Sequence, residues 1–142
     1  MKLRTGFVLA LAILSLLFAV GSLHANEVAE KAAIAASGAW VSLVDGGDYA
    51  ESWNQASALF KTAVTKEQWQ QSLKAVRAPL GKMVARKLKS KQYTKNLPGA
   101  PDGEYVVIQY ETTFEKKQSA IETVTPMLDK DGKWRVSGYY IK

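Results

Sequence analysis

The stretch EYVVIQYETTFE, residues 104–115, decides the fold. Its side chains alternate between an apolar and a polar set. Such a period of two is typical of a half-buried β-strand, because successive side chains point to opposite faces of a sheet. The sequence therefore predicts that one face of this strand packs on the core. The predicted inward set is Val106, Ile108, Tyr110, Thr112 and Phe114.

Further strands are predicted on both sides of this stretch. Residues 119–128 and 133–141 flank the turn DKDG at 129–132, whose glycine accepts the positive φ that a tight hairpin needs. Residues 82–94 alternate weakly and predict the first strand. A loop with two prolines and two glycines, LPGAPDG at 97–103, joins it to the central stretch. Hairpin-linked strands pair antiparallel, so a four-stranded antiparallel sheet is expected.

The last predicted strand turns one set of side chains inward. Trp134, Val136 and Tyr140 share one side of this strand, which we expect to face the core. Trp134 is therefore predicted to pack beneath the helices, near Trp53 or Trp69, with most of its ring buried.

Helices are predicted before the sheet. Residues 27–44 carry alanines at helical spacing, and the glycines at 46–47 end this first helix. Asp48 is predicted to cap the second helix, with Glu51 completing a capping box and an apolar face that continues to Phe60.

A third helix is predicted from a second capping box, formed by Thr65 and Gln68, and Pro79 ends it. Its apolar face consists of Trp69, Leu73 and Val76. Three helices followed by four strands predict an α+β domain with the helices packed on one face of a curved sheet. A strongly curved sheet of this kind leaves a cavity beneath the helices.

The first 25 residues have the pattern of a secretory signal peptide. Two basic residues precede an uncharged, mostly apolar stretch over residues 6–20, and Ala25 precedes Asn26 at the expected cleavage site. The apolar stretch is shorter than the roughly 20 residues of a membrane-spanning helix, although an uncleaved anchor stays an alternative. Cleavage would leave a single domain over residues 26–142, which we expect to be exported and periplasmic.

The composition excludes several chemistries. The 142 residues include no cysteine and one histidine, His24, which lies in the predicted signal peptide. The mature chain would therefore lack Ser-His-Asp and Cys-His catalysis and metal sites with Cys or His ligands. No catalytic residue, no metal site and no cofactor is predicted.

The whole chain has a net charge of +6, and its positive charge is concentrated in one segment. Residues 61–95 hold ten lysines and arginines against one glutamate. Such a patch attracts anions, and for an exported protein an anionic envelope surface is expected rather than nucleic acid. The alternative is that lysines on an edge strand prevent edge-to-edge pairing. The densest part is Arg86, Lys87, Lys89 and Lys91.

Aromatic side chains are candidates for lining a binding pocket, although aromatic residues at helical or strand spacing more often belong to the core. Tyr105 and Tyr139 fall on the less apolar sides of their strands and are predicted to be more exposed than Tyr110 or Tyr140. The aromatic candidates for ligand binding are Trp40, Tyr49, Trp53, Tyr110 and Tyr140.

Two charged residues complete the candidate site. Glu122 lies on a strand of ambiguous orientation. If it faces the cavity it can act as a general base or hydrogen-bond partner, and otherwise it pairs with a lysine across the strands. Arg77 is near the end of the third helix, where it complements the helix dipole or clamps an anionic ligand.

Several stretches resemble one family of small secreted bacterial proteins. They are GDYAESW, RAPLG, LPGAPDGEYVV, ETVTPM and DKDGKWRVSGYYIK, which together extend over most of residues 26–142. The family is domain-of-unknown-function family 4019, which implies no catalytic residues. The helix-then-sheet order also resembles the broader NTF2-like (cystatin-like) cone fold, which implies a possible pocket but no function.

Two functions stay open at this point. The first is a non-enzymatic cell-envelope module that binds a small apolar or anionic ligand, or an envelope protein, through its pocket or rim. The alternative is a small isomerase or dehydratase that uses carboxylate and tyrosine groups. A homodimer is compatible with both.

Overall fold

The computed structural model describes the backbone from Thr5 to Lys142 and the side chains from residue 21 onward. The first four residues of the predicted signal peptide, and the side chains of residues 5–20, therefore lie outside the described part. In the part that is described, no helix is both long and apolar enough to cross a membrane.

Helices come first and strands last. The helices are α1 (Thr5–Asp45), α2 (Tyr49–Asn54), α3 (Ala58–Ala63), α4 (Lys66–Arg77) and a single 3-10 turn, η1 (Ala78–Leu80). The strands are β1 (Met83–Thr94), β2 (Tyr105–Phe114), β3 (Lys117–Leu128) and β4 (Trp134–Ile141).

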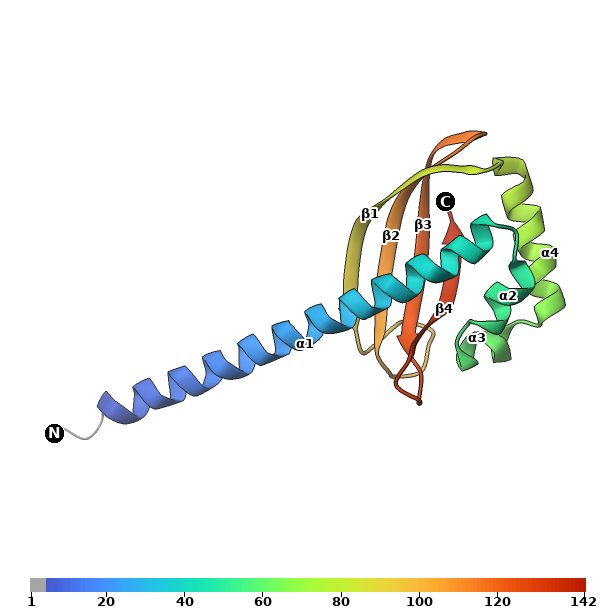
Figure 1. The fold of residues 1–142 in the computed structure, drawn as a ribbon. Helices are drawn as coiled ribbons and strands as arrows, with labels where there is room; N and C mark the ends of the chain where they lie inside the picture. The colour runs from blue at the N-terminus through green and yellow to red at the C-terminus, as the bar shows by residue number, and fades with distance from the viewer. Residues whose placement is uncertain (1–4) are drawn as a thin grey trace.

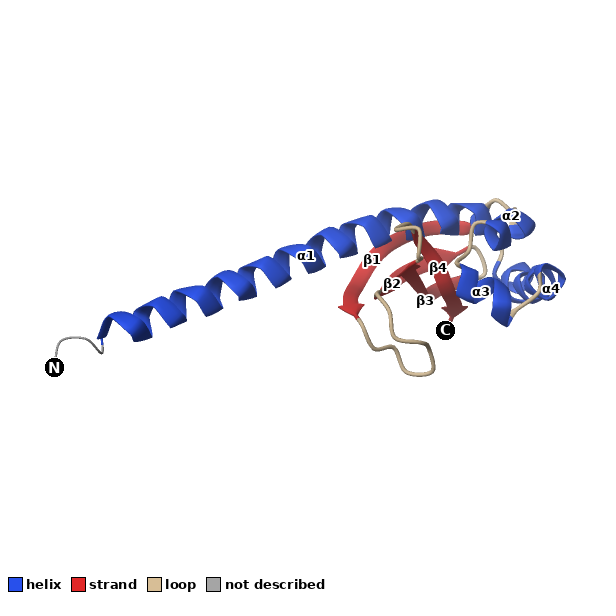
Figure 2. Cartoon of the chain, turned by 90° about the horizontal axis from the view of Figure 1, so that it is seen from below, coloured by secondary structure: helices blue, strands red, loops and turns tan. Residues whose placement is uncertain are grey.

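The strands form one open antiparallel sheet in the order β1-β2-β3-β4. The C-terminal part of α1 crosses one face of this sheet, and its N-terminal part extends beyond the sheet (Figure 1). Seen from below, the loop between β1 and β2 projects away from α1, toward the opposite side of the sheet (Figure 2). We call the face under α1 the inner face and the opposite one the outer face. The predicted α+β class and the four-stranded antiparallel sheet are confirmed.

The central strand β2 packs as its alternation predicts. All five residues of the predicted inward set are buried. They join a core that α1, α3, α4 and the α2–α3 connection supply from the other side, where the buried apolar residues include Ala33, Trp40, Val41, Val44, Ala56, Phe60, Trp69 and Leu73.

The helices differ from the prediction in number and length. The first helix begins at Thr5 instead of residue 27, so it runs through the predicted cleavage site. The predicted second helix is two short helices. Ser57 interrupts it because its backbone N–H donates to the Val136 carbonyl of β4 at 2.8 Å, while its side chain caps α3. Asp48 precedes α2, but its side chain makes no capping hydrogen bond.

The third predicted helix, α4, is confirmed with its capping box. Thr65 and Gln68 exchange hydrogen bonds of 3.0 and 3.2 Å, each between the side chain of one and the backbone N–H of the other. The α-helix ends at Arg77, and Pro79 lies in the 3-10 turn that follows. Val76 is exposed rather than packed on the core, which corrects its predicted place on the apolar face.

A β-bulge in the last strand reverses two predicted orientations. Val136 pairs with Pro126 and Gly138 with Thr125, so Ser137 is an extra residue in β4. The side chains beyond it change faces. Tyr139 therefore packs on the core, whereas Tyr140 lies on the outer face and is 57% exposed.

Tyr105 is also buried, although its strand pattern predicts exposure. It lies on the outer face at the start of β2, where the 97–103 loop covers it. Its hydroxyl donates to the Pro101 carbonyl at 2.7 Å. Cover from a loop is not visible in the alternation of a strand.

Candidate functional site

Glu122 lies at the centre of the inner face and is 0% exposed. Its Oε1 accepts hydrogen bonds from Arg86 Nε at 2.7 Å and from Thr112 Oγ1 at 2.5 Å. Its Oε2 accepts a hydrogen bond from the Tyr139 hydroxyl. The carboxylate therefore faces the interior, which is one of the two orientations that the sequence left open. Its hydrogen-bond partners come from β1, β2 and β4.

Asp45, the last residue of α1, extends this arrangement to the helices. Its carboxylate accepts from both terminal nitrogens of Arg86, at 2.7 and 2.9 Å, and from Arg77 Nη2 at 2.9 Å. A negative charge at a helix C-terminus is unfavourable by itself, and two guanidinium groups offset it here. We call Asp45, Arg77, Arg86, Glu122 and Tyr139 the ionic network.

The ionic network shifts the pKa values of Asp45, Arg86 and Tyr139. Burial alone would raise the pKa of Asp45, but hydrogen bonds from Arg86 and Arg77 outweigh it, so the pKa lies below its ordinary value. Burial, reinforced by the negative charge of Glu122, raises the pKa of Tyr139. Burial would lower the pKa of Arg86, but its bonds to the two carboxylates raise it. At neutral pH Asp45 is thus ionised, Arg86 is charged and Tyr139 is a neutral phenol.

Stability is expected to fall in acid through Asp45. Because its pKa is lower in the folded than in the unfolded chain, its contribution is fully present above about pH 4 and is lost as the pH falls through the folded value. Asp45→Asn should therefore destabilise the protein at pH 7 and flatten the decline of the unfolding free energy below about pH 4. Urea titrations across this range measure both effects. An unchanged slope would contradict this role of Asp45.

Aromatic side chains fill the space beneath the helices where a cavity is expected from the sequence. The rings of Trp40, Trp69 and Tyr139 contact one another, with the Trp40 centroid 5.9 Å from that of Trp69 and 5.3 Å from that of Tyr139, and the latter two 6.4 Å apart. Trp69 also meets Phe60 edge to face at 4.8 Å. The indole nitrogens of both tryptophans donate to Ser52, one to its carbonyl and one to its hydroxyl. Packed side chains thus occupy the space between the sheet and the helices. The four pockets described below lie elsewhere.

The predicted binding residues do not gather around one cavity. Arg77 and Glu122 are brought together through the ionic network. Trp40, Tyr49 and Tyr110 belong to the core or pack against it, and the Tyr110 hydroxyl bonds Ser37 at 3.0 Å. Trp53 is half-buried and donates to the Val64 carbonyl, with Lys61 and Lys66 near its ring. Tyr140 lies apart on the outer face.

The predicted basic patch is divided between the two faces of β1. Arg86 points inward and belongs to the ionic network, which corrects its place in a surface patch. Lys87 pairs with Glu111, and Lys91 pairs with Glu30 of α1. Lys89 is the extra residue of a β-bulge in this edge strand. Bulges and lysines both oppose edge-to-edge pairing, so the geometry favours the alternative stated for this patch.

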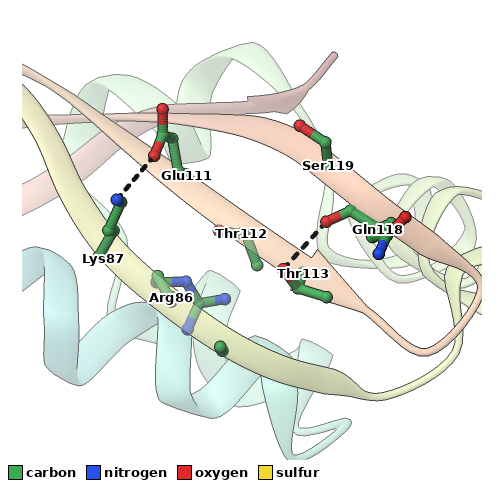
Figure 3. A pocket seen from close by; sticks show the side chains of 8 residues that line it. Arg86, Lys87, Glu111, Thr112, Thr113, Gln118 and Ser119 are labelled. Carbon is green, nitrogen blue, oxygen red and sulfur yellow. Dashed lines mark hydrogen bonds and ion pairs between the residues drawn. The ribbon is translucent and has the colours of Figure 1, made fainter.

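A shallow polar pocket of about 390 Å³ lies where β1, β2 and β3 adjoin (Figure 3). Lys87 and Glu111 lie side by side in it, with their charged atoms 3.3 Å apart, and the Thr113 hydroxyl donates to the Gln118 carbonyl. Arg86 also lines it, but Asp45 and Glu122 hold its guanidinium. Since these groups already satisfy one another, they offer little to a ligand.

A larger pocket, about 650 Å³, lies at one end of the sheet. The 97–103 loop, α3 and the β3–β4 turn all gather at this end (Figure 1). We call it the end pocket. Its residues are Ala58, Leu59, Thr62, Pro101, Asp102, Gly103, Tyr105, Met127, Leu128, Asp129, Lys130, Asp131 and Arg135.

The sequence does not predict the end pocket, because the predicted pocket lies beneath the helices. The signal that could have found it is the two turn-rich segments LPGAPDG and DKDG, which adjoin β2 and β3 at the same end of the sheet. Loops held by a rigid sheet commonly carry binding residues. The third and fourth pockets adjoin Trp134 and the 97–103 loop, with volumes of about 440 and 340 Å³.

The structure places the chain among small α+β domains with helices on one face of an open antiparallel sheet. The chain belongs to the DUF4019 family, described as a protein of unknown function, whose family model matches residues 36–139. The resemblance to that family is thereby confirmed. Comparisons with curated proteins and with solved structures gave no significant match.

Proposed function

We propose that the chain is a non-enzymatic binding module that takes a small amphipathic ligand in the end pocket. The observation that carries this proposal is the make-up of the pocket. Leu59, Met127 and Leu128 supply apolar surface beside the buried Tyr105, and the charged side chains come from the 97–103 loop, the β3–β4 turn and the start of β4. Small-molecule sites are commonly concave, mostly apolar and about 300–1,000 Å³ in volume, with a few polar groups that orient the ligand.

The charged groups of the end pocket are fixed in place. Arg135 Nη1 donates to Asp129 and to Asp131, both at 2.9 Å, and its Nη2 donates to Asp131 at 2.9 Å. This fork holds the β3–β4 turn in one conformation. A preformed rim lowers the entropy cost of binding.

Replacing Met127 by glutamine should weaken binding of a compact apolar probe, such as a naphthalene sulfonamide dye without a charged group, by about tenfold. The amide puts a polar group against the apolar wall, and tenfold corresponds to about 1.4 kcal/mol. Fluorescence titration of the probe measures the dissociation constant.

Ile121→Gln is the matched control. Ile121 is a half-buried residue of the same strand on the same outer face, and it does not line the end pocket. Its substitution should leave the dissociation constant unchanged. Equal weakening by both substitutions, or no saturable binding to the unaltered protein, would refute the end pocket as a ligand site.

We extend the proposal to location: the chain is exported, and cleavage after Ala25 leaves residues 26–142 in the periplasm. Burial of the described side chains supports this cleavage. Leu23 and Val28 are largely exposed, and the first buried side chain of the described part is Ala33. Cleavage at this site would therefore remove no core contact that the structure describes. The intact mass of protein purified from the periplasm should match a chain that begins at Asn26, and a mass that includes residue 1 would indicate an anchor instead.

An enzyme built on carboxylate and tyrosine groups is the less supported alternative. Its best pair is Glu122 and Tyr139, which bond each other in the ionic network. Neither lines any of the four pockets described above, and both Glu122 oxygens already accept hydrogen bonds. This geometry fixes charges within the core and supports a structural role for the pair.

A further inference from the structure

The end pocket continues into a second pocket along the 97–103 loop. This loop pocket, about 340 Å³, shares Leu59, Pro101 and Tyr105 with the end pocket. Because the two pockets share these three residues, they adjoin, and we treat them as one elongated groove between α3 and the loop. Its floor on β3 runs from Thr125 to Leu128, which is roughly 10 Å of strand.

Charge is distributed unequally along this groove. None of the residues lining the loop pocket is charged; they are Leu59, Phe60, Ala63, Leu97, Pro98, Gly99, Ala100, Pro101, Tyr105, Thr125, Ser137 and Gly138. Every charged residue lies at the other end: Asp102, Asp129, Lys130, Asp131 and Arg135. The groove therefore changes from apolar to polar along its length, which matches a molecule with an apolar chain and a polar head.

The charges at the polar end favour a head group that donates hydrogen bonds. Three carboxylates face two cations there. Arg135 is already engaged by Asp129 and Asp131, so its guanidinium is not free to hold an anion. Asp102, across the pocket mouth on the loop, adds a further negative charge. An amine or a hydroxyl fits this end better than a carboxylate or phosphate does.

An extended peptide fits the floor of the groove less well. Thr125 pairs with Gly138 in the sheet, and the Thr125 carbonyl also accepts the Ser137 hydroxyl at 2.7 Å. Peptides that bind along a sheet need free backbone partners at an edge strand. A saturated chain needs none, because burial of its methylene groups supplies the affinity.

The wall formed by the loop is held in shape. Ala100 N–H donates to the Leu97 carbonyl at 3.1 Å, and Gly103 N–H donates to the Lys95 carbonyl at 3.2 Å. The Tyr105 hydroxyl fixes Pro101 from below. Gly99 adopts a φ of +80°, which a residue with a side chain would adopt only with strain. The motif LPGAPDG is thus explained as a preformed wall.

We infer that the ligand is a linear amphiphile, with its alkyl chain in the loop pocket and an amine or hydroxyl head beside Asp102. This inference rests on the proposed function, because it assigns the chemical class of the ligand in the same groove.

A series of straight-chain alkylamines of increasing length tests the alkyl-chain assignment, at concentrations below micelle formation. Affinity should rise about fourfold for each added methylene, equivalent to about 0.8 kcal/mol, and then level off once the groove is filled. The compact apolar dye is measured in parallel. If the dye binds and affinity does not depend on chain length, this inference fails and the proposed function stands. If neither binds, both fail.

Gly138→Leu locates the chain. A Cβ at this position would meet only the Thr125 Cβ within 4 Å, at 3.9 Å, so the added side chain enters the loop pocket without a backbone clash. Long alkylamines should bind at least tenfold more weakly to this variant, whereas the compact dye should bind unchanged. Ser119→Leu, on an exposed position of β3 outside the groove, is the control. Unchanged binding of long chains to Gly138→Leu would overturn the inference.

Asp102→Asn tests the head group. The substitution should reduce the affinity of the alkylamine while leaving that of the alcohol of equal chain length unchanged. An alkyl carboxylate that binds more tightly than the amine to the unaltered protein would overturn the assignment of the head.

Discussion

Replacing Arg86 by methionine is expected to lower the free energy of unfolding by about 3–5 kcal/mol, because it leaves two carboxylates without their shared partner. Arg86 contacts Glu122 at 2.7 Å and Asp45 at 2.7 and 2.9 Å. Glu122 would keep only the hydroxyls of Thr112 and Tyr139, which carry no charge. Methionine retains the length of the side chain, so the loss reports on charge more than on volume.

Chemical denaturation of Arg86→Met and Lys87→Met measures this difference. Lys87 is the next residue of β1, is 77% exposed and pairs with Glu111 across the sheet. An exposed ion pair contributes about 0–1 kcal/mol, so Lys87→Met should change little. If the two variants unfold at the same denaturant concentration, the ionic network does not stabilise the fold as described.

A double substitution, Arg86→Met with Glu122→Met, separates the two causes of the loss. Removing both charges leaves no uncompensated carboxylate at Glu122, so the double variant should be more stable than Arg86→Met alone. Asp45 keeps Arg77 at 2.9 Å in both variants. A double variant that is less stable than Arg86→Met would mean that Glu122 contributes without Arg86.

The parts of the fold that follow from local chemistry could be predicted from the sequence. Alternation in residues 104–115 correctly predicts the buried face of β2. The capping box at Thr65 and the glycine turn at Gly132 also form as predicted, with Gly132 at a φ of +82°. In each case a few neighbouring residues determine the conformation, so no knowledge of the rest of the chain is needed.

Contacts between distant segments account for what could not be predicted. Ser57 interrupts the predicted second helix because its N–H meets β4, 79 positions along the chain from Ser57 itself. The Ser137 bulge reverses Tyr139 and Tyr140, and alternation alone gives no sign of an extra residue. Tyr105 is buried by a loop that is not part of its sheet.

Only one member of the ionic network, Glu122, could be singled out from the sequence as a carboxylate that faces the interior. Glu122 stands out as a carboxylate on an apolar strand, and its burial was one of two stated outcomes. Its partner Arg86 is hidden among the lysines of β1. That strand has bulges after Met83 and after Leu88, which disrupt the alternation that would have marked Arg86 as inward. A weak strand pattern next to a candidate carboxylate is therefore a reason to examine every arginine on that strand.

The second large effect is expected at Trp40, although the sequence directs attention to Trp134. Trp40 is 3% exposed, contacts the rings of Trp69 and Tyr139, and donates to the Ser52 carbonyl at 2.7 Å. Trp134 is partly buried, packs against the core near Trp40 and α1, and lines a surface pocket. The prediction that it packs on the core with most of its ring buried is therefore confirmed, and the residues beside it in that pocket include Trp40 and Leu43 of α1.

Trp40→Ala should lower the unfolding free energy by about 3–5 kcal/mol, the usual cost of truncating a buried tryptophan. The total unfolding free energy of a domain is about 5–15 kcal/mol, so this variant should lose a large part of its stability and melt at a lower temperature. Trp134→Ala should cost less, about 1–2 kcal/mol, because Trp134 is only partly buried and already meets solvent along one side. Lys89→Ala, at the exposed bulge of β1, should change the stability by less than about 0.5 kcal/mol.

Thermal melts followed by circular dichroism rank the three variants, and the expected order of loss is Trp40, then Trp134, then Lys89. The order of loss is the decisive result, because the Ser137 bulge packs Tyr139 against Trp40 and not against Trp134. Without the bulge, Tyr139 would face outward and Trp40 would lose its edge-to-face partner at 5.3 Å. If Trp134→Ala loses as much stability as Trp40→Ala, the bulge at Ser137 and the core packing described around it are wrong.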